Sequence, residues 1–163
     1  MSNPYEAACI AANLRPRRNI IDAYEQAVGM ETGVELKCHG NQLAEGRMLD
    51  VDLKLLAEAM LQPHPFDRLE ISYNELGSES GEALKNFLEA DTRLRTLDLT
   101  CNELAPAPCC AILKGLEKNS ALQELRLSGN TLGDEAGLQL AELLQVNDTL
   151  RQLHLANCGP QPC

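Results

Sequence analysis

One motif recurs along this chain at a fixed interval of 28 residues. Residues 94–104 read LRTLDLTCNEL, and residues 122–132 read LQELRLSGNTL. Related copies begin at Leu69 and Leu150, so the asparagine-type positions fall at 74, 102, 130 and 158, and a more divergent copy covers residues 36–43. A constant period of this length indicates a stack of similar units, here about five copies, of which the last is incomplete.

Each copy predicts a strand, a turn and then a helix. Leucines alternate within the motif as in a strand, so Leu125 and Leu127 point inward while Arg126 and Ser128 point outward. The asparagine lies at the turn, where its amide can satisfy buried backbone groups, and Cys158 replaces it in the last copy. Apolar residues then follow a helical period in residues 81–88 and 137–144.

The units favour an α/β solenoid, because one strand and one helix cannot bury their apolar faces alone. Parallel strands then line the inner surface of a short right-handed arc, and helices, which are wider, line the outer surface. We expect a helical N-terminal cap over residues 1–33 and repeats over residues 34–163. Arg15, Arg17 and Arg18 form a basic cluster in the cap, which we interpret as a solvated turn.

The last predicted strand, residues 150–155, is followed by no helix that could cover its leucines. An uncovered sheet edge favours association with further chain. We expect that this edge either continues into more repeats or docks on a partner, and we favour the first.

Composition excludes several classes of function. With 24 acidic and 14 basic side chains the net charge is −10, which disfavours nucleic acid as a partner. No run of eighteen apolar residues occurs, so we expect no membrane span. Seven cysteines without an export signal predict reduced thiols and a cytoplasmic protein, and no paired spacing suggests a metal site.

No catalytic constellation is evident. His39, His64 and His154 are far apart in the predicted fold, and no nucleotide-binding or nucleophile motif occurs. We therefore expect no enzyme activity, no cofactor and no small-molecule substrate. Binding of a protein on the strand face is the more natural prediction, with Tyr73 as an aromatic anchor. The outward positions chosen as partner-binding candidates are Lys37, His39, Arg68, Glu70, Tyr73, Thr96, Asp98, Arg126 and His154.

The motif L-x-x-L-x-L-x-x-N-x-L with a full helix in each unit resembles the ribonuclease-inhibitor subtype of leucine-rich repeat. Members of that subtype include ribonuclease inhibitors, activators of small GTPases, actin-capping tropomodulins and axonemal subunits. The cap beginning at Asn3 and Pro4, followed by a divergent first copy, also resembles the start of the leucine-rich repeat-containing protein thirty-four family. That family is associated with ciliated and germ-line cells and with the nucleolus.

The resemblance implies a non-enzymatic scaffold or interaction module within a larger assembly, such as a ciliary axoneme complex. A cytoplasmic location, or one in the cilium or nucleus, goes with this interpretation. The alternative is a regulator of an enzyme, either a ribonuclease inhibitor or a GTPase activator.

Overall fold

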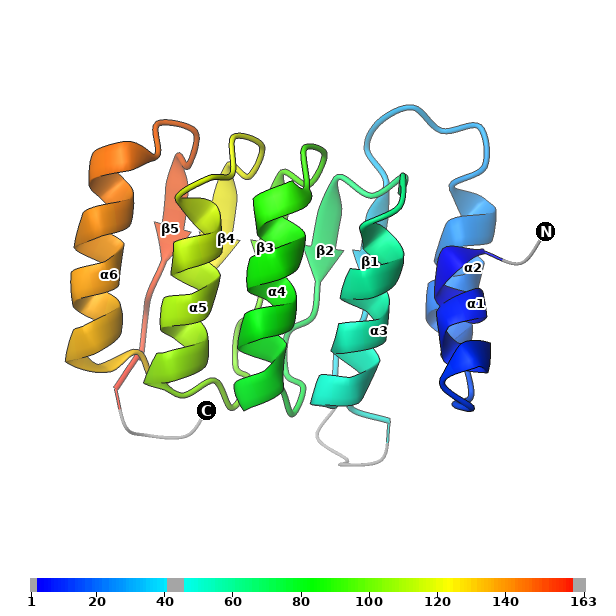
Figure 1. Ribbon diagram of the computed structural model, residues 1–163, viewed down its shortest axis with the longest axis horizontal. Coiled ribbons are helices and arrows are strands. Elements are labelled where there is room, and N and C mark those ends of the chain that lie inside the picture. The colour runs from blue at the N-terminus through cyan, green and yellow to red at the C-terminus, as the bar shows by residue number, and fades with distance from the viewer. Residues whose placement is uncertain (1–2, 41–45, 160–163) are drawn as a thin grey trace.

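The computed structural model describes residues 3–40 and 46–159, and it contains six helices and a five-stranded sheet (Figure 1). Asn41 and Leu43 of the first copy, and Cys163, lie outside the described residues. The helices are α1 (Pro4–Ala11), α2 (Arg18–Gln26), α3 (Asp50–Met60), α4 (Ser78–Ala90), α5 (Pro106–Leu116) and α6 (Gly133–Val146). The strands are β1 (Glu35–Lys37), β2 (Arg68–Glu70), β3 (Thr96–Asp98), β4 (Glu124–Arg126) and β5 (Gln152–His154).

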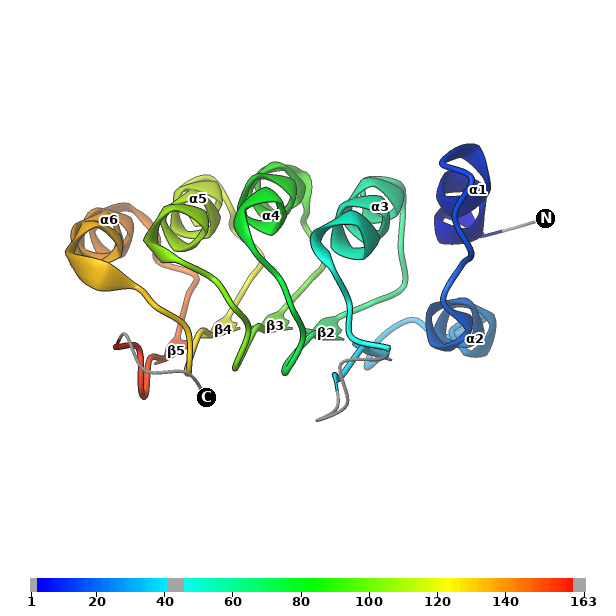
Figure 2. The same ribbon diagram turned by 90° about the horizontal axis from the view of Figure 1, so that it is seen from below.

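The strands form one parallel sheet in chain order, as the repeat predicts. Leu69 pairs with Leu97, Leu97 with Leu125, and Leu125 with Leu153. Figure 2 shows the strands in one layer and α3 to α6 in a second layer that fans out more widely. The motif leucines fill the space between the layers, and Leu97, Leu99, Leu125 and Leu127 are fully buried. The predicted solenoid is confirmed.

The motif asparagines link neighbouring coils. Asn102 donates through its side-chain amide to the carbonyls of Ile71 in the preceding coil (3.0 Å) and Leu99 in its own (2.9 Å). Its Oδ1 accepts the backbone N–H of Asn74 at 3.1 Å, and Asn130 repeats the pattern one coil later. These bonds satisfy backbone groups that water does not reach. The structural role predicted for the asparagines is therefore confirmed for Asn74, Asn102 and Asn130.

A second row of polar side chains joins the coils where each helix passes into the next strand. Asn119 accepts the backbone N–H groups of Ala121 and Leu122, and its amide donates to the carbonyls of Leu88 and Asp91. Asn147 makes the equivalent bonds one coil later.

Asp91 occupies the same place one coil earlier but has no amide hydrogens to donate backwards. Buried His64 lies against it instead, with Nε2 2.9 Å from Asp91 Oδ1. Burial acts to raise the pKa of Asp91, but the contact with His64 and the backbone N–H groups of Leu94 and Arg93 hold that pKa below its usual value. A carboxylate with a histidine partner thus replaces the amide used in the later coils.

The prolines of α5 lie in its first turn, where they restrict the backbone, as their position predicts. They also give α5 a packing surface that differs from those of the neighbouring helices. A Cβ atom added at Gly81 of α4 would lie 2.5 Å from the Cα atom of Pro108, so only glycine fits there. The two helices pack closely because one contributes no side chain at this contact.

At the amino end, α1 and α2 lie beside the first coil (Figure 1). Ile20 and Tyr24 of α2 are buried, and the ring of Tyr24 meets Phe66 edge-on with centroids 4.8 Å apart. Arg17 bonds to Asp52 of α3 at 2.8 Å and to the carbonyls of Gly46 and Arg47. The interpretation of the basic cluster as a solvated turn is therefore wrong for Arg17, because this arginine fastens the cap to the first repeat.

Leucines at the last strand are only partly covered. Leu150, Leu153 and Leu155 are half-buried, whereas their counterparts Leu122, Leu125 and Leu127 are buried. This difference agrees with the uncovered edge that the sequence predicts.

One cysteine contradicts the prediction of reduced thiols. Cys101 is disulfide-bonded, while Cys9, Cys38, Cys109, Cys110 and Cys158 are free. Cys101 lies half-buried in the turn after β3 and not in the core. The number of cysteines and the lack of an export signal carry no information on which thiols the fold brings together.

Candidate protein-interaction surface

Five of the predicted binding residues stand in one row across the strand face. The register pairs Lys37 with Glu70, Glu70 with Asp98, Asp98 with Arg126, and Arg126 with His154. We call these five residues the concave row. A parallel row, two residues earlier on each strand, contains Arg68 and Thr96 together with Glu35, Glu124 and Gln152.

The carboxyl-terminal half of the concave row is an ion-pair network. Arg126 lies 2.7 Å from Glu124 and 3.4 Å from Asp98, and His154 lies 3.3 Å from Glu124. The carboxylates are largely buried, since the side chains of Asp98 and Glu124 are 14% and 15% exposed, whereas that of Arg126 is 44% exposed. This half therefore presents the Arg126 guanidinium and the His154 ring outward on a negative base, and the contacts hold both groups in place.

The amino-terminal half has a different chemistry. His39 Nδ1 lies 2.8 Å from Ser72 Oγ and 3.3 Å from Glu70, and the His39 ring packs on Tyr73 with centroids 5.1 Å apart. Lys37 pairs only with Glu35 of its own strand among the described residues, at 3.1 Å. An exposed aromatic pair beside a charged row is a typical anchor for a protein partner.

The sequence interpretation placed Tyr73 on a strand, but in the structure it does not lie on one. It follows β2 in the turn, with a positive φ of 59°, and Cys101, Gly129 and Asn157 repeat this left-handed conformation at the same point of later coils. The turn directs the tyrosine outward, where its side chain is about half exposed. The ring is accessible because of the turn geometry and not because of strand alternation.

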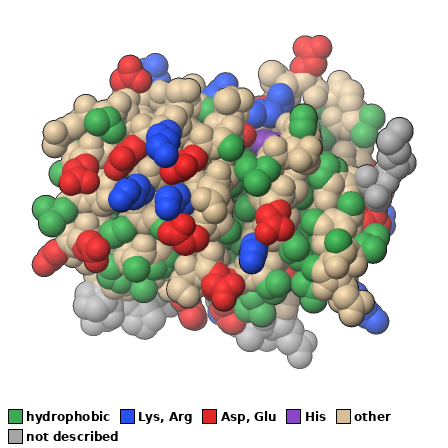
Figure 3. Space-filling model, viewed as in Figure 1, with side chains coloured by type: hydrophobic (Ala, Val, Ile, Leu, Met, Phe, Trp, Pro, Cys, Tyr) green, Lys and Arg blue, Asp and Glu red, His purple; other side chains and the backbone are tan. Residues whose placement is uncertain are grey.

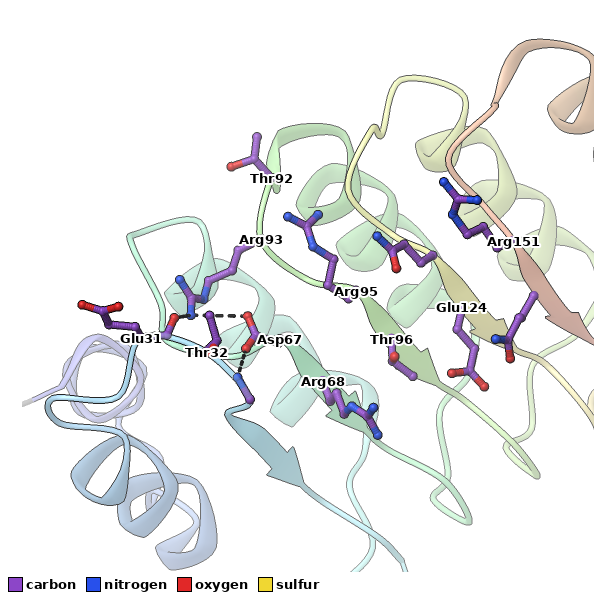
Figure 4. Close-up of a pocket in the computed structure, with 13 residues that line it drawn as sticks. Glu31, Thr32, Asp67, Arg68, Thr92, Arg93, Arg95, Thr96, Glu124 and Arg151 are labelled. Carbon is purple, nitrogen blue, oxygen red and sulfur yellow. Dashed lines mark hydrogen bonds and ion pairs between the residues drawn. The ribbon is translucent and has the colours of Figure 1, made fainter.

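A groove of about 700 Å³ lies where the chain enters the strands, and Figure 4 shows the residues that line it. We call it the arginine groove, because Arg68, Arg93, Arg95 and Arg151 line it together with Asp67, Gln123 and Glu124. Two of the residues that line the groove, Arg68 and Thr96, are among the predicted binding residues. The sequence interpretation missed Arg95 and Arg151, although both occupy the position after the first leucine of the motif, at the regular repeat spacing.

The described residues contain no arrangement typical of a reaction centre. His64 is the one buried histidine among them, and its Nδ1 has no hydrogen-bond partner there. Burial raises the pKa of the Cys38 and Cys109 thiols to about 12, which keeps both protonated and weakly nucleophilic. Within residues 3–40 and 46–159 no group of three or more histidine, cysteine or acidic side chains could hold a metal ion.

The opposite surface, formed by the helices, has no comparable order. Figure 3 shows acidic and basic side chains mixed over this face, with apolar side chains between them. The basic residues there include Lys85 and Lys118, each paired with one nearby glutamate at 3.3 Å. No helix in the described part of the chain is long and apolar enough to cross a bilayer.

This chain is a leucine-rich-repeat solenoid, as defined by its repeated motif, by the register of its parallel strands and by the rows of asparagines that join its coils. The family model described as Leucine Rich repeat matches residues 66–85 and 118–141. A comparison with curated proteins gives no match.

Solved structures that share the fold include the following two. The Caenorhabditis elegans tropomodulin C-terminal domain is 13% identical, with a TM-score of 0.68 over 85% of this chain and 83% of that one. Leiomodin-1 Actin-Binding Site 2 is 19% identical, with a TM-score of 0.67 over 86% and 80%. At such identities the similarity shows the fold alone. The ribonuclease-inhibitor subtype and the resemblance to leucine-rich repeat-containing protein thirty-four stay predictions.

Proposed function

We propose that this chain is a non-enzymatic protein-interaction module that binds its partner on the concave face. The observation that carries the proposal is the concave row, in which Glu70, Asp98, Arg126 and His154 from four successive strands form one continuous polar strip. Ion pairs fix the positions of the charged groups before any partner arrives, so little side-chain entropy is lost on binding. Tyr73 and His39 supply an apolar anchor at one end of the strip.

Actin is the first partner to test, because one structure of the same fold is named as an actin-binding site. The test is co-sedimentation of the chain with filaments and titration with monomers. The paired variants are Tyr73→Ala/Asp98→Ala on the concave face and Lys85→Ala/Lys118→Ala on the helix face. If actin is the partner, the concave variant binds at least tenfold more weakly while the helix variant binds as the wild type does.

A second experiment tests the concave face whatever the partner is. A photo-crosslinking phenylalanine analogue replaces Tyr73 in one protein and Lys85 in a control, and both are irradiated in cytosolic extract. We expect a discrete adduct from position 73, suppressed by excess unlabelled wild-type chain but not by the Tyr73→Ala/Asp98→Ala variant. Equal adducts from both positions would show that the concave face is not the binding surface.

Placement in a ciliary assembly stays a prediction of the resemblance, as does the enzyme-regulator alternative. Neither gains support from a particular contact among the described residues. Addition of the chain to ribonuclease and GTPase assays separates the alternative from a scaffold, and we expect unchanged rates in both.

A further inference from the structure

The arginine groove is a basic region on a protein that is acidic overall. Its four arginines differ in how many hydrogen bonds and ion pairs they make. Arg93 is the most engaged of the four, because Nε donates to the Pro65 carbonyl at 2.9 Å while a terminal nitrogen donates to the Glu31 carbonyl at 2.6 Å. The same terminal nitrogen pairs with Asp67 at 3.3 Å, and Asp67 also accepts the backbone N–H of Gly33. These contacts tie the loop after the cap to the second coil.

The other three arginines have no carboxylate partner among the described residues. Arg95 donates to the Ala121 carbonyl at 2.8 Å, which fixes its guanidinium but leaves most of its donors unused. The side chains of Arg68 and Arg151 make no hydrogen bond or ion pair with other residues of 3–40 and 46–159. Figure 4 shows Arg95 and Arg151 projecting at the entrances of β3 and β5.

The acidic groups of the groove do not neutralise these three arginines. Asp67 is held by Arg93 and Gly33, and Glu124 by Arg126 and His154. Glu31 lies at the far end, and Figure 4 shows its carboxylate turned away from Arg95 and Arg151. Three guanidinium groups without a carboxylate partner among the described residues therefore line an open groove.

The spacing of the arginines fits an extended peptide. Arg95 and Arg151 occupy equivalent positions two strands apart, which places their backbones roughly 10 Å from each other. Acidic residues two to four positions apart in an extended chain span a similar distance, since each residue advances about 3.3 Å. Guanidinium groups bind carboxylates through paired hydrogen bonds, and Gln123 between the two arginines can bond a peptide group.

We propose that the arginine groove binds an acidic, carboxylate-rich protein segment, held by Arg68, Arg95 and Arg151. A long polyanion fits less well, because the net charge of −10 repels it outside the groove. The inference rests on the proposed function, in that it gives the interaction module a second contact of stated chemistry. The groove lies beside the concave row, so one partner can reach both surfaces.

The test uses a fluorescent peptide of ten residues, six of them glutamate, and a matched peptide with glutamine at those positions. Fluorescence anisotropy measures binding to the wild-type chain and to Arg95→Gln/Arg151→Gln. Arg15→Gln/Arg18→Gln is the control, since it removes the same charge from the turn of the cap. Arg151→Gln alone is a further variant, because it removes no bond of the described structure.

We expect binding of the glutamate peptide only, weakened at least tenfold in the groove variant and by less than twofold in the control. Raising the salt concentration from about 0.05 M to 0.3 M weakens it further, because the contacts are exposed. Equal losses in both double variants, equal binding of the glutamine peptide, or tighter binding of inorganic phosphate would overturn the proposal. All variants keep the concave row, so failure of the wild-type chain to bind the glutamate peptide, together with retained binding of a partner on the concave face, refutes this inference and not the proposed function.

Discussion

The same repeat position has opposite environments in the middle of the solenoid and at its carboxyl end. Leu88 of α4 and Leu116 of α5 are fully buried, whereas Leu144, at the equivalent position of α6, is 58% exposed. The motifs are alike and all three leucines lie on helices. What differs is the neighbour, because α4 and α5 are each followed by another coil.

This comparison shows where the stability of the molecule resides. A leucine contributes about 1.5–3 kcal/mol on full burial, and in a solenoid the next coil provides much of that burial. The polar rows follow the same rule, since the amides of Asn102 and Asn130 each bond to the preceding coil. The stabilising unit is therefore the contact between two coils and not the single repeat.

The largest expected effect is that of Leu116→Ala in the interior. The substitution leaves a cavity between α5 and its neighbours, and we expect the free energy of unfolding to fall by about 2–5 kcal/mol. Urea denaturation followed by circular dichroism measures this change. A loss below about 1 kcal/mol would mean that the interior coils do not depend on one another as the burial indicates.

Asn102→Ala tests the polar row in the same interior. It leaves the buried N–H of Asn74 without its acceptor and removes one of the two amide donors at each of the Ile71 and Leu99 carbonyls, which keep their bonds from Asn74 and Asn130. We expect a loss of about 1–3 kcal/mol, which is the cost of one buried group without a hydrogen-bond partner. Cys158→Ala at the edge is the control, and equal losses in the two variants would contradict the difference between interior and edge.

Asp91→Asn tests how the carboxylate of this coil differs from the amides of the later coils, through the pH dependence of the free energy of unfolding. The pKa of Asp91 is lowered in the fold, so its contribution is present above the ordinary value of 3.8 and is lost as pH falls through the lowered pKa. The asparagine variant resembles Asn119 and Asn147, and its stability should vary less with pH in this acidic range. Acid titration of the unfolding midpoint measures the effect, and identical titration curves would show that Asp91 is not the group responsible.

Much of the fold follows from the period alone. Repetition places Leu97 beside Leu125 and Asn102 beside Asn130, because equivalent residues of stacked units must meet. Contacts that break the repetition could not be predicted in this way. Arg17 reaches Asp52 across 35 positions, and His64 meets Asp91 because one coil has a carboxylate where the others have an amide.

The candidate site was predictable where the strand register defines it. Alternation within the motif gives the concave row, and the register of β2 to β5 places Glu70, Asp98, Arg126 and His154 together. The exposure of Tyr73 depends on a left-handed turn that non-glycine residues rarely adopt. Arg95 and Arg151 could have been found from their spacing, but which arginines lack acidic partners is a property of the packed structure.

The smallest expected effect is that of Leu144→Glu, which is also the most direct test of the comparison. The side chain is largely in contact with solvent, so replacing it removes little burial and places a charge in water. We expect the free energy of unfolding to change by no more than about 0.5 kcal/mol, measured beside Leu116→Glu, which should not fold. A large loss at position 144 would mean that this leucine is covered in solution, and sedimentation velocity of the wild type would then show whether a second copy covers it. If the free energy of unfolding of Leu144→Glu is unchanged, the shared core of the described solenoid ends before the exposed leucine of α6.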